Sequence, residues 1–299
     1  MPDSSQTIAT THMLSFDVEE YFQVEAAAEA GLRPQDWAGL PPRLGRSVAK
    51  ILRLLEEHQV RATFFVLGWV ARHEAEVVKA IAAKGHEIAS HGMNHQMLTR
   101  LSPHEFRQDL ADSRKALEDI AGKPVFGYRA PTFSIMHKNA WAIDVLAESG
   151  FVYDSSVFPI RNDRYGVPDA PRGCHIAQGP GGGRLLEIPP VTRRILGSNI
   201  PVGGGGYFRL FPLGLLRGAL RKMQSAGQAG MIYLHPWEFD PDQPVLPMGR
   251  LSRFRHRVGL AGTEKKLARL LAEFHFGDVG SCLDALKESA PLHQYGRAI

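Results

Sequence analysis

Two histidines stand four residues apart in the segment EIASHGMNH, at positions 91 and 95. Residues 86–90, just before them, are predicted to form a short buried strand, so His91 and His95 would follow its carboxyl end. Imidazoles at this spacing can converge on one point, which is an arrangement typical of metal ligands. An isolated pair of this kind more often bonds to local backbone groups, so the interpretation depends on the other residues nearby.

Further ionisable residues follow the other predicted strands. In chain order they are Asp17, Glu19, Glu20, Arg129, Asp154 and His235. Each of them alone could have an ordinary structural role, such as a surface ion pair or a turn. In parallel α/β barrels, however, the carboxyl ends of all strands form one rim, and the active site lies there. The sequence therefore predicts that these residues gather in one site.

The elements that would position these residues alternate along the chain. Strands are predicted over residues 12–16, 61–68, 86–90, 125–129, 151–155 and 230–235. Helices are predicted over residues 43–59, 103–121, 138–148, 212–225 and 264–274. Ser102 and Glu105 have the spacing of a capping box at the start of the second of these helices. This alternation predicts an α/β fold with a parallel sheet, either closed into a barrel or open.

Two segments interrupt the alternation. Residues 160–211 are rich in glycine and proline and are predicted to form an insertion of hairpins and ordered loops at one end of the barrel. Residues 239–262 are a second irregular segment before the last predicted helix. We expect one domain over residues 1–299, with the insertion at about 160–211 and a C-terminal extension at about 239–299.

The composition narrows the class of protein. The chain has 299 residues, of which 44% are apolar and 22% are charged, so it can bury a sizeable core. The net charge of +4 is a small excess without a basic block, and no nucleic-acid partner is expected. Cys174 and Cys282 fit neither a disulfide framework nor a zinc finger. Residues 1–13 lack the features of a signal peptide, and no apolar run approaches the roughly 20 residues of a transmembrane helix, so we expect a cytoplasmic protein.

In order and spacing, the ionisable residues resemble the polysaccharide deacetylase family, the NodB-homology carbohydrate esterases. Five motifs carry the resemblance, and the second and third are the specific ones: SFDVEE (15–20), SHGMNH (90–95), RAPTF (129–133), YDSS (153–156) and IYLHPWE (232–238). The glycine-rich insertion and the tail RFRHRVGLAGTEKK are similar to the branch associated with exopolysaccharide and exosortase loci. The resemblance implies a distorted or incomplete (β/α) barrel of about seven parallel strands. It also implies metal-dependent removal of N-acetyl groups from amino sugars.

The resemblance implies a metal site formed by Glu19, His91 and His95. The family's first motif has two adjacent aspartates, a base and a metal ligand, whereas here Val18 follows Asp17. We expect Asp17 to be the base and Glu19 to be the ligand, because side chains two apart in an extended chain point to the same side. A tight turn after Asp17 would instead favour Glu20 as the ligand. Zinc is the first expected ion, and cobalt, nickel or iron also suit these ligands.

The remaining roles concern protons and the oxyanion. Arg129 is expected to hold Asp17 through a bidentate pair. His235 would protonate the departing amine, and Asp154 would orient His235 and keep it cationic. By resemblance, the backbone N–H of Phe133 would help to bind the oxyanion.

Aromatic residues supply candidates for the wall of a substrate groove, because sugar rings stack on aromatic faces. Besides Phe133, the candidates are Trp237, Tyr207 and Phe208. Aromatic residues of this kind belong to the core about as often as to a site.

We therefore expect a metal-dependent hydrolase that releases acetate from an N-acetylated glycan or its precursor. A hydrolase of a small-molecule C–N bond, in a ureide or cyclic imide, is a same-fold alternative, because fold does not determine substrate. A glycan-binding module without catalysis is a second alternative, which the missing adjacent aspartate leaves open. An iron oxygenase is a weaker third, because no pattern for anchoring a cosubstrate surrounds the triad.

Overall fold

The computed structural model describes residues 10–162 and 164–296. Most of the N-terminal stretch in which the sequence predicts no signal peptide lies outside these ranges. Within them, none of the helices combines the length and the apolar character that a membrane span requires.

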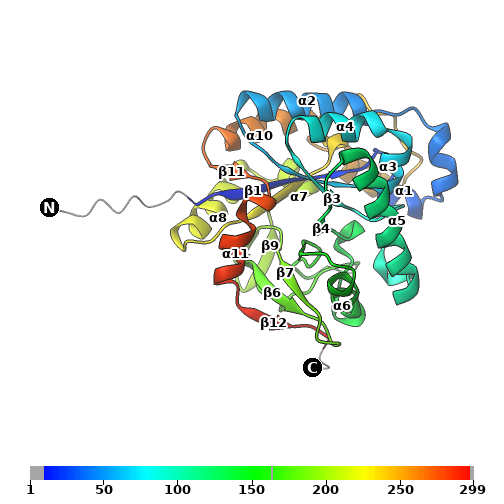
Figure 1. Cartoon of the computed structure of the whole chain (residues 1–299). Helices are drawn as coiled ribbons and strands as arrows, with labels where there is room; N and C mark the ends of the chain where they lie inside the picture. Colours follow the sequence, from blue (N-terminus) through cyan, green and yellow to red (C-terminus); the bar gives the residue numbers. More distant parts are fainter. Residues whose placement is uncertain (1–9, 163, 297–299) are drawn as a thin grey trace.

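The centre of the molecule is a mostly parallel sheet (Figure 1). Its parallel strands, in spatial order, are β10 (Met231–Leu234), β1 (His12–Val18), β2 (Thr63–Val66), β3 (Glu87–Ser90), β4 (Gly127–Tyr128), β5 (Tyr153–Asp154) and β7 (Arg184–Glu187). Helices between successive strands place this sheet in the α/β class, as the sequence predicts. The strands also lie where the sequence predicts them, except β7, which comes from the glycine-rich segment 160–211.

The two outer strands of this run approach each other. Pro190, shortly after β7, forms an isolated parallel bridge with Met231 of β10, and Gly204 forms another with Tyr233. The N–H of Val191 donates to the carbonyl of Met231 at 2.9 Å. The sheet therefore curves into a distorted (β/α) barrel in which isolated bridges replace a full ladder between the outer strands.

The segment 160–211 contributes to the barrel wall as well as to hairpins. In addition to β7 it contains β6 (His175–Gln178), which pairs with β7 in antiparallel fashion. A separate hairpin consists of β8 (Thr192–Ile195) and β9 (Ser198–Pro201). Two short strands extend the main sheet: β12 (Leu292–Gln294) pairs with β6, and β11 (Phe276–Gly277) pairs with β1.

Helices surround the sheet. In Figure 1, α2 (Leu44–Glu57), α4 (Ala75–Ala83) and α10 (Thr263–Leu271) lie along one side of β1. Helix α5 (Pro103–Ala121) lies near β3, and α6 (Trp141–Glu148) packs against α5 and β7. The other α-helices are α1 (Glu25–Glu29), α3 (Gly68–His73), α7 (Gly205–Leu210), α8 (Leu213–Ser225), α9 (Arg250–Arg257) and α11 (Leu283–Ser289). Short 3-10 helices are η1 (Pro34–Gly39), η2 (Leu98–Arg100), η3 (Pro131–Phe133), η4 (His137–Asn139), η5 (Pro236–Phe239), η6 (Leu260–Gly262) and η7 (Gly280–Cys282).

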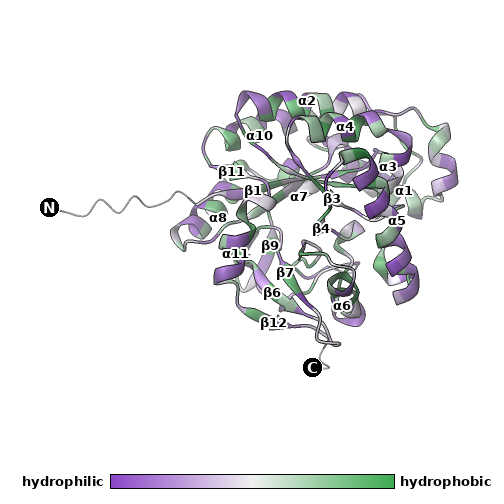
Figure 2. Ribbon diagram, viewed as in Figure 1, coloured by the Kyte–Doolittle hydropathy of each residue, from purple (hydrophilic) through white to green (hydrophobic). Residues whose placement is uncertain are grey.

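The two ends of helix α5 are determined by the local sequence. The hydroxyl of Ser102 accepts the N–H of Glu105 at 3.3 Å, and the Glu105 carboxylate accepts the N–H of Ser102 at 2.8 Å, which confirms the predicted capping box. The helix ends at Gly122, whose φ of +64° is in the left-handed region that glycine adopts readily. Figure 2 shows apolar residues on the inner sides of the helices and polar residues on their outer sides.

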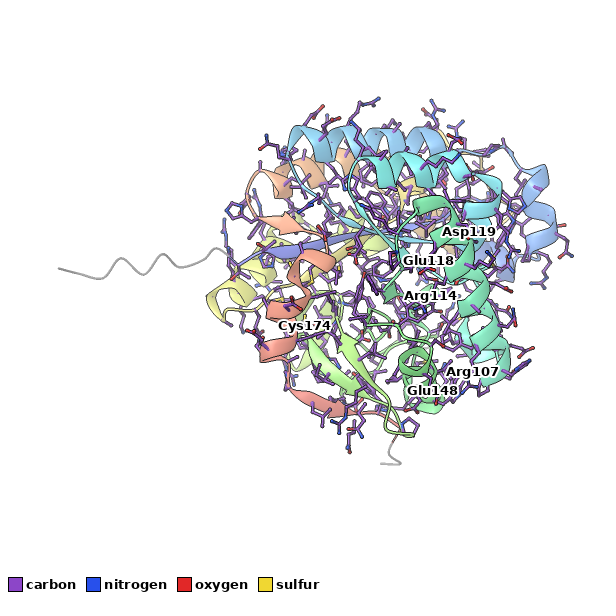
Figure 3. The ribbon with its side chains drawn as sticks, viewed as in Figure 1. Arg107, Arg114, Glu118, Asp119, Glu148 and Cys174 are labelled. Carbon is purple, nitrogen blue, oxygen red and sulfur yellow. The ribbon has the colours of Figure 1, made fainter. Side chains whose placement is uncertain are left out.

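Helices α5 and α6 are also joined on their outer side (Figure 3). Arg107 of α5 forms an ion pair with Glu148 of α6 at 2.7 Å. The guanidinium of Arg114 lies 3.9 Å from the centroid of the Phe151 ring and donates to the carbonyl of Ser149 at 2.6 Å. These contacts fix the loop that leads into β5, at the end of the barrel opposite the rim.

Candidate active site

Strand β1 brings two acidic side chains to the carboxyl end of the barrel. Phe16 and Val18 point into the apolar core, whereas Asp17 points to the opposite side of the strand. The strand ends at Val18, where the N–H of Glu19 donates to the carbonyl of Asp17 at 3.1 Å. The chain therefore turns just after Asp17, and Glu19 enters the site from this turn.

Glu19, His91 and His95 form a cluster that fits a metal ion. Their ligand atoms all lie within 4.8 Å of one another. The Oε2 atom of Glu19 lies 2.7 Å from Nε2 of His95, and the ring centroids of the two histidines are 5.3 Å apart. One carboxylate and two imidazoles are a donor set that zinc and similar divalent ions bind, and three protein ligands leave open positions.

Neighbouring groups orient these three side chains. Nδ1 of His91 donates to the carbonyl of Arg129 at 2.8 Å, which leaves its Nε2 lone pair for a metal. The indole N–H of Trp237 donates to Oε1 of Glu19 at 3.0 Å. His95 has a φ of +50°, a left-handed conformation that a non-glycine residue adopts at a cost and that is frequent at functional sites. The donor set and its surroundings are therefore those expected of a metal centre.

The charges in this cluster also suit metal binding. Burial raises the pKa of the Glu19 carboxyl, but His95, His235 and His91 outweigh that effect and hold the pKa well below its usual range. Burial lowers the pKa of His91 to about 4. A carboxylate and a neutral imidazole are the protonation states that bind metals.

Glu20, the alternative ligand, points away from the cluster. Its carboxylate accepts the N–H of Leu44 at 2.7 Å and also the N–H of Arg43. These N–H groups belong to the first turn of α2, where backbone donors have no partner within the helix and a negative charge is favourable. Glu20 is fully buried in this position and caps α2, so Glu19 is the acid that faces the two histidines.

Arg129 holds Asp17 from a buried position. Its Nη1 lies 2.5 Å from Oδ1 of Asp17 and also donates to the hydroxyl of Ser15 at 2.9 Å. Its Nε and Nη2 donate to the carbonyl and the hydroxyl of Ser155, at 3.2 and 2.8 Å. The predicted bidentate pair is therefore not observed, because Ser155 takes the other side of the guanidinium.

His235 lies on the other side of the two acids. Its Nε2 is 3.9 Å from Oδ2 of Asp17 and 3.8 Å from Oε1 of Glu19. Its Nδ1 is 3.5 Å from Oε2 of Glu238. Burial lowers the pKa of His235, but Glu238, followed by Glu19 and Asp17, outweighs burial and raises it to about 9. These carboxylates therefore favour the protonated form of the imidazole.

Glu238, which the sequence analysis gave no role, is fixed by a buried arginine. Oε1 of Glu238 accepts Nε of Arg209 at 2.7 Å, and both side chains are almost fully buried. Arg209 also donates to the carbonyls of His256 and Val258, at 3.0 and 2.6 Å. The glycine-rich segment and the C-terminal extension thus meet at the carboxylate beside His235. The one feature of the sequence that pointed to Glu238 was its place three residues after His235 in HPWE.

Asp154 does not occupy the predicted place beside His235. It is fully buried, where it accepts the hydroxyl of Ser156 and shares a hydrogen bond with Glu187. Burial raises the pKa of Asp154 to about 6. In the parallel pairing of β5 with β7, Asp154 is the register partner of Glu187, so the two acids lie on the same side of the sheet. In the described ranges the carboxylates within 4.0 Å of His235 are those of Asp17, Glu19 and Glu238.

Phe133 belongs to an aromatic cluster next to the site. Its ring centroid lies 4.8 Å from that of Tyr233, 5.1 Å from Phe158 and 6.3 Å from Tyr165. The N–H of Phe133 donates to the carbonyl of Ala130 at 3.1 Å, so this amide is not directed at an oxyanion as expected. Tyr165, which is partly exposed, is an aromatic candidate that the sequence analysis missed.

The other predicted groove residues have different surroundings. Trp237 is 7% exposed and is stacked between the rings of His235 and His256, with centroid distances of 5.0 and 4.3 Å. Trp237 therefore orients the site and offers little surface to a sugar. Phe208 belongs to the apolar core, whereas Tyr207 on the same helix is partly exposed.

Comparison with known families covers most of the chain in two parts. Residues 41–153 match the family described as polysaccharide deacetylase, and residues 155–284 match a domain of unknown function, DUF3473. The first match contains His91, His95 and Arg129, and the second contains His235 and Glu238. Asp17 and Glu19 precede both matches.

Two curated proteins illustrate the similarity. A chitooligosaccharide deacetylase of Bradyrhizobium sp. (strain ANU 289) is 31% identical over 99 residues, which are 33% of this chain and 43% of that protein. A peptidoglycan-N-acetylglucosamine deacetylase of Bacillus cereus is 34% identical over 96 residues, which are 32% of this chain and 35% of that protein. The chain thus spans less than half of the length of these relatives.

Two solved structures share the fold over nearly the whole chain. A protein of Mycobacterium smegmatis assigned as a polysaccharide deacetylase has a TM-score of 0.63 and 22% identity, and the match covers 100% of this chain and 98% of that one. Puue allantoinase has a TM-score of 0.58 and 16% identity, and the match covers 97% of this chain and 95% of that one. At these identities the two structures show the fold alone. The chain therefore contains a polysaccharide deacetylase region over residues 41–153, followed by a DUF3473 region over residues 155–284.

Proposed function

We propose that the protein is a metal-dependent deacetylase that removes acetyl groups from the N-acetylated amino sugars of a polysaccharide or its precursor. The observation that carries this proposal is the convergence of three kinds of group at one end of the barrel. They are the Glu19, His91 and His95 cluster, the carboxylate of Asp17 and the imidazole of His235. The relatives that match in sequence are named as deacetylases of chitooligosaccharides and peptidoglycan, which supports the same reaction class.

Hydrolysis of an amide requires an activated water, stabilisation of an oxyanion and a proton for the departing amine. Bound by Glu19, His91 and His95, a divalent ion would lower the pKa of a water and polarise the acetyl carbonyl. Zinc is the ion that we propose first, and cobalt, nickel and iron suit the same donors.

Asp17 is the residue that we propose as the general base. Arg129 binds its Oδ1 at 2.5 Å, which leaves Oδ2 directed toward the site, 3.9 Å from Nε2 of His235. The bond to Arg129 fixes the orientation of this carboxylate. Oδ2 would take a proton from the water as the water oxygen bonds to the acetyl carbon.

His235 is the residue that we propose as the general acid. As the C–N bond breaks, its Nε2 would transfer a proton to the nitrogen of the departing amino sugar, so that a neutral amine and acetate are released. Glu238 keeps the imidazole protonated, and its own carboxylate is held by Arg209 at 2.7 Å. The two proton-transferring residues thus have separate ionic partners, as their opposite roles require.

The fold alone does not identify the substrate class, because an allantoinase has the same fold. Two further features support an amino-sugar substrate. Tyr165 is partly exposed beside Phe133, whose ring contacts Arg129 and Tyr233. Tyr165 offers an aromatic surface on which a sugar ring could stack. The resemblance of the glycine-rich segment to the exopolysaccharide-associated branch favours an exopolysaccharide as the polymer.

A substrate panel tests this proposal. Metal-loaded protein would be incubated with oligomers of N-acetylglucosamine, with N-acetylgalactosamine oligomers and with allantoin, and acetate and ring-opened product would be measured. We expect acetate from at least one amino-sugar oligomer and no turnover of allantoin. Asp17→Asn protein prepared in the same way is the control for contaminating activity. Ring opening of allantoin without acetate release would support the small-molecule alternative instead.

A further inference from the structure

A basic helix with exposed apolar side chains lies at the same end of the barrel as the candidate active site. Helix α9 follows β10 through η5, so it belongs to the connections at the carboxyl end of the strands. Its eight residues, RLSRFRHR, include four arginines. No acidic residue occurs in the sequence between Asp242 and Glu264.

The arginines of α9 keep an uncompensated charge. In residues 10–162 and 164–296, no carboxylate lies within ion-pair distance of Arg250, Arg253, Arg255 or Arg257. Arg253 and Arg257 donate to backbone carbonyls, which are neutral. A hollow of about 390 Å³ is lined by Arg250, Arg253, Phe254, Arg257 and Val258. The hollow therefore combines three guanidinium groups with apolar side chains.

Large apolar side chains are exposed beside these charges. Leu251 and Phe254 lie one turn apart on α9 and are 61% and 58% exposed. Val245, in the loop before the helix, is 58% exposed. Exposed leucine and phenylalanine next to arginines are the composition of helices that lie in a membrane interface.

Helix α9 is fixed to the site by two contacts. Arg209, which binds Glu238, donates to the carbonyls of Arg255 and His256 at 3.1 and 3.0 Å. The ring of His256 stacks on that of Trp237 at a centroid distance of 4.3 Å. The exposed residues of α9 are therefore held at a constant position relative to the catalytic groups.

We propose that α9 docks the protein on an anionic membrane surface. The arginines would bind the phosphate groups of lipid heads, and Leu251 and Phe254 would enter the boundary with the acyl chains. An anionic glycan would satisfy the arginines, but the aliphatic chains of Leu251 and Val245 gain little from stacking on sugar rings. In a bilayer, by contrast, the side chains of Leu251 and Val245 are both removed from water. The inference concerns where the protein meets its substrate and does not depend on which bond is hydrolysed.

Co-sedimentation with vesicles tests the proposal. The full chain would be mixed with vesicles of phosphatidylcholine alone, or of equal parts phosphatidylcholine and phosphatidylglycerol, at low and high salt. The variants are Arg250→Gln/Arg253→Gln and Leu251→Ser/Phe254→Ser, because these four side chains do not contact the catalytic groups. The matched control is Lys123→Gln/Phe126→Ser, a cation and a 47% exposed phenylalanine that precede β4, at the opposite end of the barrel.

We expect binding to the anionic vesicles only, and weaker binding at high salt. The double arginine variant should bind roughly 25-fold more weakly, about fivefold for each arginine. The Leu251→Ser/Phe254→Ser variant should lose about tenfold or more of its affinity for anionic vesicles. The Lys123→Gln/Phe126→Ser control should bind as the natural protein does. No binding to anionic vesicles, or equal binding by all variants, would overturn the proposal. Arginine-dependent binding to the soluble polyanion alginate without binding to vesicles would also overturn it, in favour of a glycan surface.

Discussion

Nδ1 of His235 lies 3.5 Å from Oε2 of Glu238, three residues later in the chain. The η5 turn produces this relationship, because the N–H of His235 donates to the same carboxylate oxygen at 3.0 Å. The acid beside the proposed proton donor is therefore Glu238 of the same HPWE segment, whereas the sequence analysis predicts Asp154 of β5 in this place. This pairing determines the first prediction.

Glu238→Gln should move the alkaline limb of the rate profile to lower pH. His235 is active as the imidazolium, which exists below its pKa, and Glu238 helps to raise that pKa to about 9. A neutral amide removes this support, so the pKa falls and activity is lost at lower pH. Rates of the metal-loaded protein across neutral to alkaline pH measure the shift.

Asp154→Asn is the matched control for this experiment, because Asp154 pairs with Glu187 and not with His235. Its alkaline limb should coincide with that of the natural protein. A shift in Asp154→Asn together with an unchanged limb in Glu238→Gln would return the role to Asp154. Thermal unfolding should accompany both measurements, since breaking the buried Glu238 and Arg209 pair is expected to cost about 3–5 kcal/mol.

The two adjacent glutamates should behave differently when each is changed to glutamine. Glu19→Gln removes the anionic donor of the metal cluster, so purified protein should lose most of its metal. Glu20→Gln should keep its metal and lower the free energy of unfolding by about 1 kcal/mol, because it weakens the cap of α2. Metal analysis and urea unfolding of both variants measure this difference. Metal kept in Glu19→Gln and lost in Glu20→Gln would reverse the assignment.

Asp17→Asn should keep bound metal and lose turnover by about a hundredfold or more, as expected when a general base is removed. The side chain is nearly isosteric and is held by Arg129, so the binding of substrate should change little. Metal content, kcat and KM of the purified variant measure the effect. Full activity in Asp17→Asn would show that another group accepts the proton.

His91→Ala and His95→Ala should each lose the metal while the far-UV circular dichroism stays unchanged. The loss of affinity should exceed the 10–100-fold that removal of an outer hydrogen-bond partner causes. Met93→Leu is a control in the same motif, because it conserves an apolar side chain that is not a ligand. Stoichiometric metal in either histidine variant would mean that the two imidazoles have a structural role only.

The fold and the rim residues could be predicted because their signals are local. A buried strand such as β1 shows in its apolar residues, and polar residues after parallel strands must meet at one rim. The contact of Arg129 with Ser155 and that of His235 with Glu238 could not be predicted in this way. The contact between Arg209 and Glu238 joins residues 29 positions apart, and its geometry depends on carbonyls of α9.

The glycine-rich segment shows a second limit of local reasoning. Its composition predicted irregular loops and hairpins, yet β7 (Arg184–Glu187) completes the parallel wall beside β5. Residues 184–187 stand between the glycine-rich stretch 179–183 and two prolines at 189–190, so their surroundings predict a loop. The pairing of β5 with β7 also accounts for the position of Asp154, since it provides Glu187 as a neighbour.

The central claim is that Glu19, His91 and His95 hold a metal that the reaction requires. The most direct measurement is acetate release from N-acetylglucosamine oligomers by protein that has been stripped of metal and then titrated with zinc, with Glu19→Gln titrated in parallel. We predict no release from stripped protein, activity that rises to a plateau at one zinc per chain, and no recovery in Glu19→Gln. Acetate release by fully stripped protein at the rate of the reconstituted protein would contradict the account.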